Sequence, residues 1–361
     1  MKSPNMFLSL VAAVAMTFGF STSTAQGQCT ADLNNDHQID GADIGQLLGQ
    51  WGTNGSADID GSGTVDGPDL AQLLAQWGPC IVVPTWATLL EAAPNASIVT
   101  DANLRSAIVA SGFAWRVHDN SSNIEMLLVP AGTFTMGCSV SDLEPCYSNE
   151  SPTHQVTLTN AFYMGRYEVT QAQWLAKMGS NPSQFQGSSY PDAANRPVEK
   201  VSWDMIAGTN ETPPSFMSVT ELRLPTEAEW EYAYRAGTTT AFHSFPRYAD
   251  GTNAETLLGN IAWFVANSGG QTHAVGGKFA NALGLHDMSG NVWEWCQDLY
   301  SDSYYASSPL TNPTGPETGL QRLLRGGVWG VTPVNCRASE RGHFVPNFIN
   351  SGNGFRVARN P

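Results

Sequence analysis

The sequence predicts an α+β protein in which a small helical module precedes an irregular, loop-rich main domain. Of its 361 residues, 35 are Gly, 21 are Pro and only 14% are charged, so many turns and little long helix are expected. In the main domain, only 170–178 and 226–237 combine a helical apolar period with a capping Thr. The remainder has the pattern of short strands joined by Gly- and Pro-rich loops.

The net charge and the N-terminal residues indicate which classes of partner to exclude and where in or outside the cell the protein is located. The net charge of −15 argues against a nucleic-acid or anionic-membrane partner. Residues 1–25 are predicted to be an export signal, because Lys2 precedes an apolar run over 6–20 and small residues lie at 23 and 25. No later stretch is long enough to span a bilayer. The protein is therefore expected to be secreted, or to lie at the cell surface or in the periplasm.

The six cysteines form an even number, and an exported protein can form disulfides. Six cysteines allow fifteen connectivities, and the alternative is that one or two of the pairs are free buried thiols. The pairs predicted from their placement are Cys29–Cys80, Cys138–Cys146 and Cys296–Cys336.

A duplicated acidic pattern lies between Cys29 and Cys80, with eight Asp and no Lys, Arg or Glu. Oxygen-bearing side chains fall at loop positions 1, 3, 5, 9 and 12, and position 7 can offer its carbonyl, which is the spacing of a calcium loop. The predicted ligands are Asp32, Asn34, Asp36, Gln38, Asp40 and Asp43 in the first copy, and Asp58, Asp60, Ser62, Thr64, Asp66 and Asp69 in the second. The alternative, a solvated acidic segment, does not explain the duplication.

Residues 29–80 resemble the dockerin modules, which are small all-α calcium-binding units. As in that family, each loop ends in Asp rather than Glu, and no full helix precedes it. The Leu-Leu pairs at 47–48 and 73–74, with Trp51 and Trp77, are expected to form a shared helical face. The resemblance implies a cohesin-like protein as partner, and a generic surface anchor is the alternative.

Residues 81–122 are expected to form a connector with two short helices, one in 84–97 and one in 100–112. Thr100 or Asp101 can cap the second helix. No chemistry is assigned to this segment.

The stretch 284–295 (GLHDMSGNVWEW) combines a Gly-Asn turn with a strand. Alternation places Trp293 and Trp295 on one face of the strand and Glu294 on the other. Asp287 and Glu294, with the turn carbonyls between them, could hold a hard cation such as calcium. The alternative is a core strand with two buried aromatic side chains and a solvated acid.

This stretch also resembles the signature of the formylglycine-generating enzyme (sulfatase-modifying factor) family. Six further blocks resemble that family in the same order: MLLVPAGTFTMG (126–137), SPTHQVTLTNAFYMGRYEVTQAQW (151–174), RPVEKVSW (196–203), LRLPTEAEWEYAYRAG (222–237), LRGGVWG (324–330) and GFRVAR (354–359). For 123–361 the resemblance implies an irregular α+β fold related to C-type lectins. His154, Glu168 and Arg235 lie in these blocks and are expected to be structural polar groups.

The resemblance further implies two calcium sites in the main domain. The expected ligands are Asp287, Glu294 and the carbonyls of Gly290 and Val292 in the first site, and Asn260 and the Ile261 carbonyl, completed from 267–271, in the second. The alternative at each site is a hydrogen-bonded turn without metal.

Enzymes of that family oxidise a substrate cysteine to formylglycine with copper held by two cysteines, and soft thiolates suit Cu(I). Their catalytic pair is Cys-x4-Cys shortly after the Gly-Gly strand. Counting forward from Gly326 and Gly327 places Val331 and Cys336 at these positions, whereas counting back from Arg341 places Cys336 at a structural position. The chain contains no Cys-x4-Cys, so copper is not expected, and Cys336 alone is left as a catalytic candidate.

Two functions follow from these observations. The first is a secreted, calcium-stabilised binding or scaffolding protein without copper oxidase activity, which is tethered by the dockerin-like module and binds an unidentified protein, peptide or glycan. The alternative is an active formylglycine-generating oxidase that converts a sulfatase cysteine to formylglycine with Cys336 in an unusual arrangement. Val331 in place of a thiolate favours the first.

Overall fold

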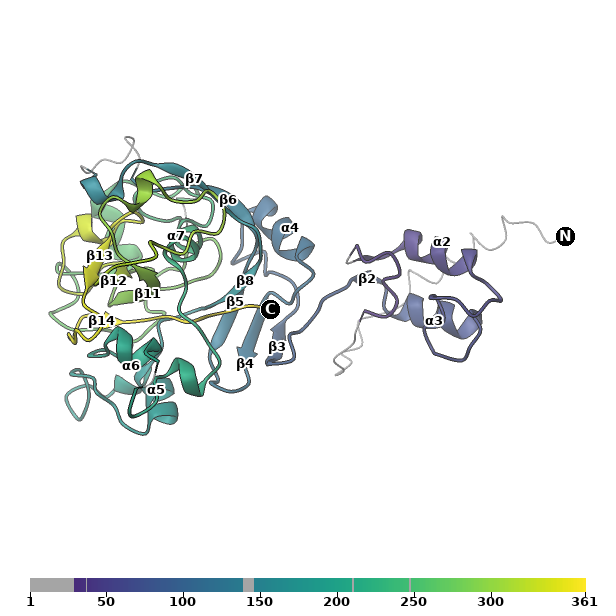
Figure 1. Cartoon of the computed structure of the whole chain (residues 1–361), viewed down its shortest axis with the longest axis horizontal. Helices are drawn as coiled ribbons and strands as arrows, with labels where there is room; N and C mark the ends of the chain where they lie inside the picture. The colour runs from purple at the N-terminus through teal and green to yellow at the C-terminus, as the bar shows by residue number, and fades with distance from the viewer. Residues whose placement is uncertain (1–28, 37, 139–145, 210, 247) are drawn as a thin grey trace. The chain divides into compact units, whose positions relative to one another are not determined.

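The computed structural model describes residues 29–36, 38–138, 146–209, 211–246 and 248–361, and the predicted export signal lies outside them. The chain divides into two compact units at the Val83–Pro84 junction. Figure 1 shows the helices and strands of both units. None of the helices in the described ranges has the length and apolar character needed to cross a membrane.

The first unit contains two helices that begin within the acidic loops. α2 (Gly41–Gly49) and α3 (Gly67–Ala75) each start with a capping box made by the Asp residues at loop positions 9 and 12. β1 (Gln38–Ile39) pairs with β2 (Gly78–Pro79), and the predicted Cys29–Cys80 disulfide is confirmed beside them. The two ends of this short segment are therefore joined both by a ladder and by a covalent bond.

The apolar core of the first unit differs in part from the predicted shared face. It consists of Ala31, Ile39, Leu47, Ala57, Val65, Leu73 and Cys80. Leu47 and Leu73 are fully buried, but Leu48 is 50% exposed and Trp51 and Trp77 are each 46% exposed. Two consecutive residues of a helix point about 100° apart, so only one Leu of each pair can face this small core.

The second unit is built on two sheets of short strands, one antiparallel and one mixed (Figure 1). The five-stranded antiparallel sheet has the order β15 (Ala358–Arg359), β8 (Phe162–Gly165), β5 (Glu125–Val129), β4 (Arg116–Asp119) and β3 (Ala87–Glu91). The four-stranded sheet has the order β13 (Gly342–Phe344), β12 (Arg322–Arg325), β11 (Trp293–Leu299) and β14 (Asn353–Gly354). Two small pairs complete the strands: β6 (Gly132–Met136) with β7 (His154–Leu158), and β9 (Ala262–Trp263) with β10 (Ser289–Gly290).

From Pro84 on, the expected connector belongs to the second unit. The stretch 84–97 was predicted to be helical, but it contributes β3, and β4 also lies before residue 123. Pairing of Thr88 with His118 and of Leu89 with Val117 extends the five-stranded sheet. This tertiary pairing overrides the local helical pattern. Only the second expected helix is present, as α4 (Ala102–Ala110), capped by Asp101.

Short helices and turns fill the rest of the second unit. α5 (Gln171–Met178) and α7 (Glu227–Arg235) begin at the predicted caps Thr170 and Thr226, each with a capping box. The remaining elements are α6 (Trp203–Ala207) and the 3-10 turns η1 (Ser148–Glu150), η2 (Ala193–Asn195), η3 (Met217–Val219), η4 (Glu255–Asn260), η5 (Tyr304–Ala306) and η6 (Pro333–Cys336). The expected mixture of short helices and strands in a loop-rich chain is confirmed.

Candidate functional site

The second acidic loop brings three carboxylates together. Asp58, Asp60 and Asp69 each place an oxygen within 4.8 Å of the other two. Asp69 Oδ1 accepts from the N–H groups of Ile59 at 2.7 Å and Asp60 at 3.0 Å. The backbone donors, that of Asp60 foremost, hold the pKa of Asp69 below its ordinary value and favour the ionised form. Three converging carboxylates of this kind fit a hard cation such as calcium.

The first acidic loop folds in the same way but with fewer clustered acids. Asp43 accepts from the N–H of Leu33 at 2.8 Å through Oδ1 and from the N–H of Asp40 at 2.8 Å through Oδ2, as Asp69 does at the equivalent positions. Asn34 replaces an acid here and donates to Asp36 Oδ2 at 2.8 Å. Within the described part of the first unit, a three-carboxylate group occurs only in the second loop.

The other expected ligands lie in the same two loops. Asp58 accepts from the N–H groups of Ser62 at 3.0 Å and Gly63 at 2.8 Å, which curls the second loop around this carboxylate. Ser62 Oγ donates to the Thr64 carbonyl at 3.2 Å. The remaining expected calcium ligands are Asp32 and Gln38 in the first loop and Asp66 in the second. The donor set of each loop therefore consists of oxygen atoms, as calcium prefers.

In the second unit, Glu294 is paired with an arginine rather than placed in solvent. The side chain is 1% exposed on β11. Its Oε1 and Oε2 accept from Arg356 Nη2 and Nε, each at 2.6 Å, and Oε2 also accepts from Trp230 Nε1 at 2.7 Å. A buried guanidinium therefore contacts both carboxylate oxygens, and the expected role of Glu294 as a calcium ligand stays a prediction. The alternative of a solvated acid is wrong.

Asp287 and Glu168 are further buried acids near this ion pair. Asp287 Oδ2 accepts from the N–H of Gly276 at 2.6 Å, whereas its Oδ1 has no hydrogen-bond partner. Glu168 accepts from Asn291 Nδ2 at 2.6 Å and from the N–H of Val292 at 3.1 Å. Burial raises the pKa of Asp287 to about 6, and burial together with the charge of Asp287 raises the pKa of Glu168 well above its ordinary value.

The backbone N–H groups of the expected ligand residues Gly290 and Val292 are both hydrogen-bonded. Val292 presents its N–H to Glu168, and the N–H of Gly290 donates to the Gly326 carbonyl at 2.8 Å. No group of three metal-ligating side chains with atoms within 4.8 Å of one another includes Asp287 or Glu294, as far as the described residues extend. The expected site combines two carboxylates with two backbone carbonyls, and calcium binding there stays a prediction.

The second calcium position expected in the main domain is a loop closed by its own hydrogen bonds. Asn260 ends η4 and donates from Nδ2 to the Leu257 carbonyl at 2.8 Å, and Ile261 is fully buried. Asn267 Oδ1 accepts from the N–H of Phe264 at 2.9 Å. This geometry agrees with the alternative of a hydrogen-bonded turn.

Cys336 lies at the end of η6 in an apolar environment. The residue is fully buried in a cluster that includes Phe242 and Phe264, and Val331 packs against the same cluster. Burial raises the pKa of the Cys336 thiol far above its ordinary value, so the thiol is protonated at neutral pH. The alkyl side chain of Val331 therefore stands where the first cysteine of the pair is expected, and the residues do not fit a copper ion.

The predicted bridge between Cys296 and Cys336 is wrong, because both thiols are free and buried. The Cys296 thiol points to the Glu294 carbonyl, with an Sγ–O distance of 3.9 Å, and that of Cys336 points to the Thr332 carbonyl at 4.0 Å. Each sulfur thus contacts a carbonyl two to four residues earlier in the chain, and the two sulfurs do not contact each other as a disulfide. Burial, rather than pairing, shields these two thiols.

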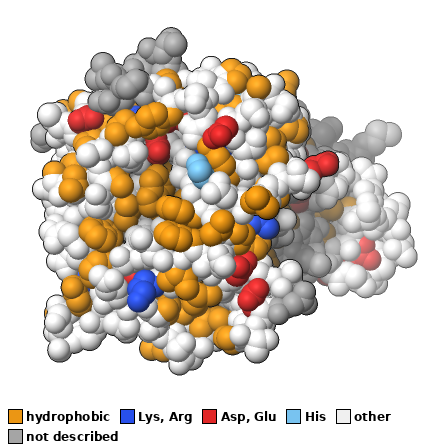
Figure 2. All heavy atoms as spheres, turned by 60° about the vertical axis from the view of Figure 1, so that its left-hand side comes forward, with side chains coloured by type: hydrophobic (Ala, Val, Ile, Leu, Met, Phe, Trp, Pro, Cys, Tyr) orange, Lys and Arg blue, Asp and Glu red, His pale blue; other side chains and the backbone are white. Residues whose placement is uncertain are grey.

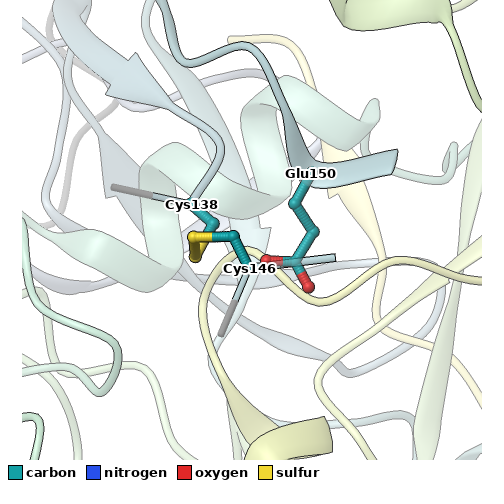
Figure 3. Close-up of side chains that lie close together, drawn as sticks. All are labelled: Cys138, Cys146 and Glu150. Atoms are coloured by element: carbon teal, nitrogen blue, oxygen red, sulfur yellow. A yellow bond between two sulfur atoms is a disulfide. The ribbon is translucent and has the colours of Figure 1, made fainter. Parts of the chain in front are cut away.

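The Cys138–Cys146 disulfide is confirmed, and Figure 3 shows Glu150 beside it. The two oxygens of Glu150 accept from Arg337 Nη2 and Nη1, each at 2.7 Å, and Arg337 Nη1 also donates to Cys138 Sγ at 3.4 Å. The two sulfurs are bonded to each other and a guanidinium holds the carboxylate. Arg337 therefore links the segment after η6 to Glu150 in η1, and the disulfide and Glu150 do not form a metal site.

Sequence reasoning missed the buried arginines of this unit. Arg325, Arg337 and Arg356 are all fully buried, and each pairs with a buried Glu. The available signal was a charge within an apolar run, as in LLRGG and GFRVA. Arg235 follows the structural expectation, because it donates from Nε to Glu231 at 2.9 Å inside α7.

The raised pKa of the buried Glu199 predicts how the stability of the protein changes with pH. Its Oε1 accepts from the N–H of Phe185 at 2.9 Å, Oε2 has no hydrogen-bond partner, and burial raises its pKa from 4.5 to about 7. The folded state therefore binds this proton more tightly than the unfolded chain, and stability should fall as the pH rises from 4.5 to about 7. Glu199→Gln should remove roughly 3 kcal/mol of that decrease, measured by urea unfolding across pH. An unchanged pH dependence in this variant would contradict the assignment.

The second unit matches a known family. Residues 114–361 match FGE-sulfatase, described as the sulfatase-modifying factor enzyme 1-like domain. The chaperone protein LppX of Paenibacillus barcinonensis is 32% identical over 277 residues, which cover 65% of this chain and 89% of that protein. A formylglycine-generating enzyme of Thermomonospora curvata is 31% identical over 300 residues, covering 65% and 93% of the two chains.

Two further similarities concern a longer protein and a solved structure. The serine/threonine-protein kinase pkn1 of Chlamydia pneumoniae is 31% identical over 258 residues, covering 65% of this chain but only 38% of the kinase. The structure of Treponema denticola variable protein 1 aligns with a TM-score of 0.56 and 33% identity, covering 66% of this chain and 95% of that one.

Proposed function

Because the chain belongs to the FGE-sulfatase family of sulfatase-modifying factor enzyme 1-like domains, we propose that it is a binding or scaffolding member of that family without the copper oxidase reaction. The environment of Cys336 carries this proposal. Its thiol is buried and protonated, and Val331 stands where the other cysteine of the pair is expected. Two thiolates are needed for linear Cu(I) coordination, and the other free thiol, Cys296, points to a carbonyl of its own strand.

The named relatives support both the proposal and its alternative. A relative named as a chaperone supports a role in protein binding without catalysis. A relative named as a formylglycine-generating enzyme supports the alternative, which is oxidation of a sulfatase cysteine through Cys336. The residues around Cys336 favour the first function.

An apolar surface of the second unit is a suitable place for a protein or peptide ligand. Figure 2 shows hydrophobic side chains gathered over much of one face, with few charged groups among them. In the segment after β12, Phe344, Val345 and Ile349 are 38%, 44% and 50% exposed. The Phe344 ring stacks on Phe348 with centroids 4.1 Å apart. Exposed apolar groups of this kind are typical of interaction surfaces.

The first unit is proposed to be the tether. Its two acidic loops would hold calcium, and the exposed Leu48, Trp51 and Trp77 would supply apolar contacts to a cohesin-like partner. A generic surface anchor remains the alternative. The predicted export signal supports a secreted protein, or one at the cell surface or in the periplasm.

Titration with Cu(I) in competition with bicinchoninate tests the absence of a copper site. The wild-type protein and Cys336→Ser are expected to withdraw equally little Cu(I), because the wild type offers no pair of accessible thiolates. A wild type that binds one Cu(I) per chain, with loss of that binding in Cys336→Ser, would contradict the proposal and support the oxidase.

A further inference from the structure

A cleft of about 640 Å³ lies at the surface of the second unit, between segments that are far apart in the chain. Its volume is typical of small-molecule sites, which measure about 300–1,000 Å³. None of its described lining residues belongs to the apolar surface around Phe344, Val345 and Ile349. We propose that this cleft binds a neutral oligosaccharide, and this proposal does not depend on the absence of the oxidase reaction.

The charged side chains of the cleft neutralise each other. Among the described lining residues, only Arg223 and Glu229 carry charged side chains. Arg223 Nη1 and Nη2 donate to Glu229 Oε2 and Oε1, at 2.7 Å each, and Arg223 Nε and Nη2 donate to Asn360 Oδ1 at 3.2 and 2.9 Å. A guanidinium that is already held by a bidentate carboxylate has no free charge for a phosphate, sulfate or carboxylate group. The charge of the cleft therefore favours an uncharged ligand.

Several uncharged hydrogen-bonding groups of the cleft are free to bind a ligand. The side chains of Gln297 and Thr314 are exposed and make no hydrogen bond to another described residue. Asn360 uses its Oδ1 for Arg223, which leaves its Nδ2 free. Asn160 donates from Nδ2 at 3.3 Å to its neighbour in the chain, which leaves its Oδ1 free. Amides and hydroxyls both donate and accept hydrogen bonds, as the hydroxyl groups of a sugar also do.

Apolar side chains form the floor of the cleft. Leu158, Phe162 and Leu224 are 4%, 2% and 0% exposed, and Phe113 is half-buried, so that part of its ring is accessible. A sugar ring presents C–H groups on its faces, which pack on aromatic and aliphatic groups, and hydroxyl groups around its edge. An apolar floor with free amides around it therefore matches both parts of an oligosaccharide.

Isothermal titration calorimetry of the full chain tests this proposal. The neutral probes are cellotriose, maltotriose and tri-N-acetylchitotriose, and the comparison probes are trigalacturonic acid, which is charged, and adenosine, which is a neutral aromatic compound. At least one neutral trisaccharide should bind, with a Kd that is the same at low and high salt. Absence of binding by all three neutral trisaccharides, or tighter binding of trigalacturonic acid or adenosine, would overturn the proposal.

Variants test whether the trisaccharide binds in this cleft. Gln297→Ala should weaken binding about fivefold, because it removes one neutral hydrogen bond. Thr314→Trp should abolish binding by filling the cleft, and Asn160→Ala replaces this variant if it does not fold. Gln321→Ala is the matched control and should bind as the wild type does, because this half-buried side chain does not line the cleft. Unchanged affinity in the cleft variants that fold, or an equal loss in Gln321→Ala, would contradict the proposal.

Discussion

Replacing Glu294 with alanine is expected to lower the free energy of unfolding of the second unit by about 3–5 kcal/mol. The change leaves the guanidinium of Arg356 fully buried without its carboxylate and removes the acceptor of Trp230 Nε1. Breaking a buried pair by removal of one partner is costly because the remaining charge cannot be hydrated. Urea unfolding followed by tryptophan fluorescence measures the difference.

Glu91→Ala is a matched control for this prediction. Glu91 also pairs with an arginine, Arg116, but the two side chains are 31% and 25% exposed. Exposed ion pairs contribute only about 0–1 kcal/mol, so this variant should be close to wild type. Equal losses of unfolding free energy in Glu91→Ala and Glu294→Ala would show that the buried pair contributes no more to stability than the exposed pair.

Removal of calcium is expected to unfold the first unit completely once the Cys29–Cys80 disulfide is reduced. The eight Asp of this unit repel one another, and its apolar core consists of seven mostly small or aliphatic side chains. The disulfide spans 51 residues, and closing a loop of that length contributes about 4 kcal/mol. Without the ion and the disulfide, that core is too small to compensate for the loss of chain entropy.

Hydrogen exchange of the 29–80 peptides after reduction, with calcium or with EDTA, is the measurement. Full exchange in EDTA and retained protection in calcium are expected. Asp69→Ala should unfold the reduced unit even in calcium, whereas Asp101→Ala, which removes the cap of α4 in the second unit, should not. Equal protection of reduced 29–80 with calcium and with EDTA would rule out calcium as its stabilising ligand.

Local patterns in the sequence predicted much of the fold. The repeat spacing placed the two acidic loops, and the caps at Thr170 and Thr226 placed the starts of α5 and α7. The disulfides at Cys29 and Cys138 also followed from placement along the chain. Each of these features depends on residues that are close in sequence or that bracket one unit.

The features that the sequence did not predict depend on distant partners. Arg356 meets Glu294 across 62 residues, and Arg337 meets Glu150 across 187. The strand β3 forms because β4 pairs with it, although its own residues favour a helix. Spacing within a single segment carries no information on such contacts. The family pattern at 284–295 predicted a calcium ligand at Glu294, and only the structure showed that Arg356 pairs with this acid.

We propose that this family member does not carry out the oxidase reaction. The most direct measurement incubates the purified protein with a Cys-x-Pro-x-Arg peptide, copper and oxygen, and assays the peptide for an aldehyde. The formylglycine-generating enzyme of Thermomonospora curvata serves as the positive control. The expected result is aldehyde with the control and none above background with this protein. Aldehyde formation by the wild type that is lost in Cys336→Ser would show that the protein is an oxidase that uses Cys336.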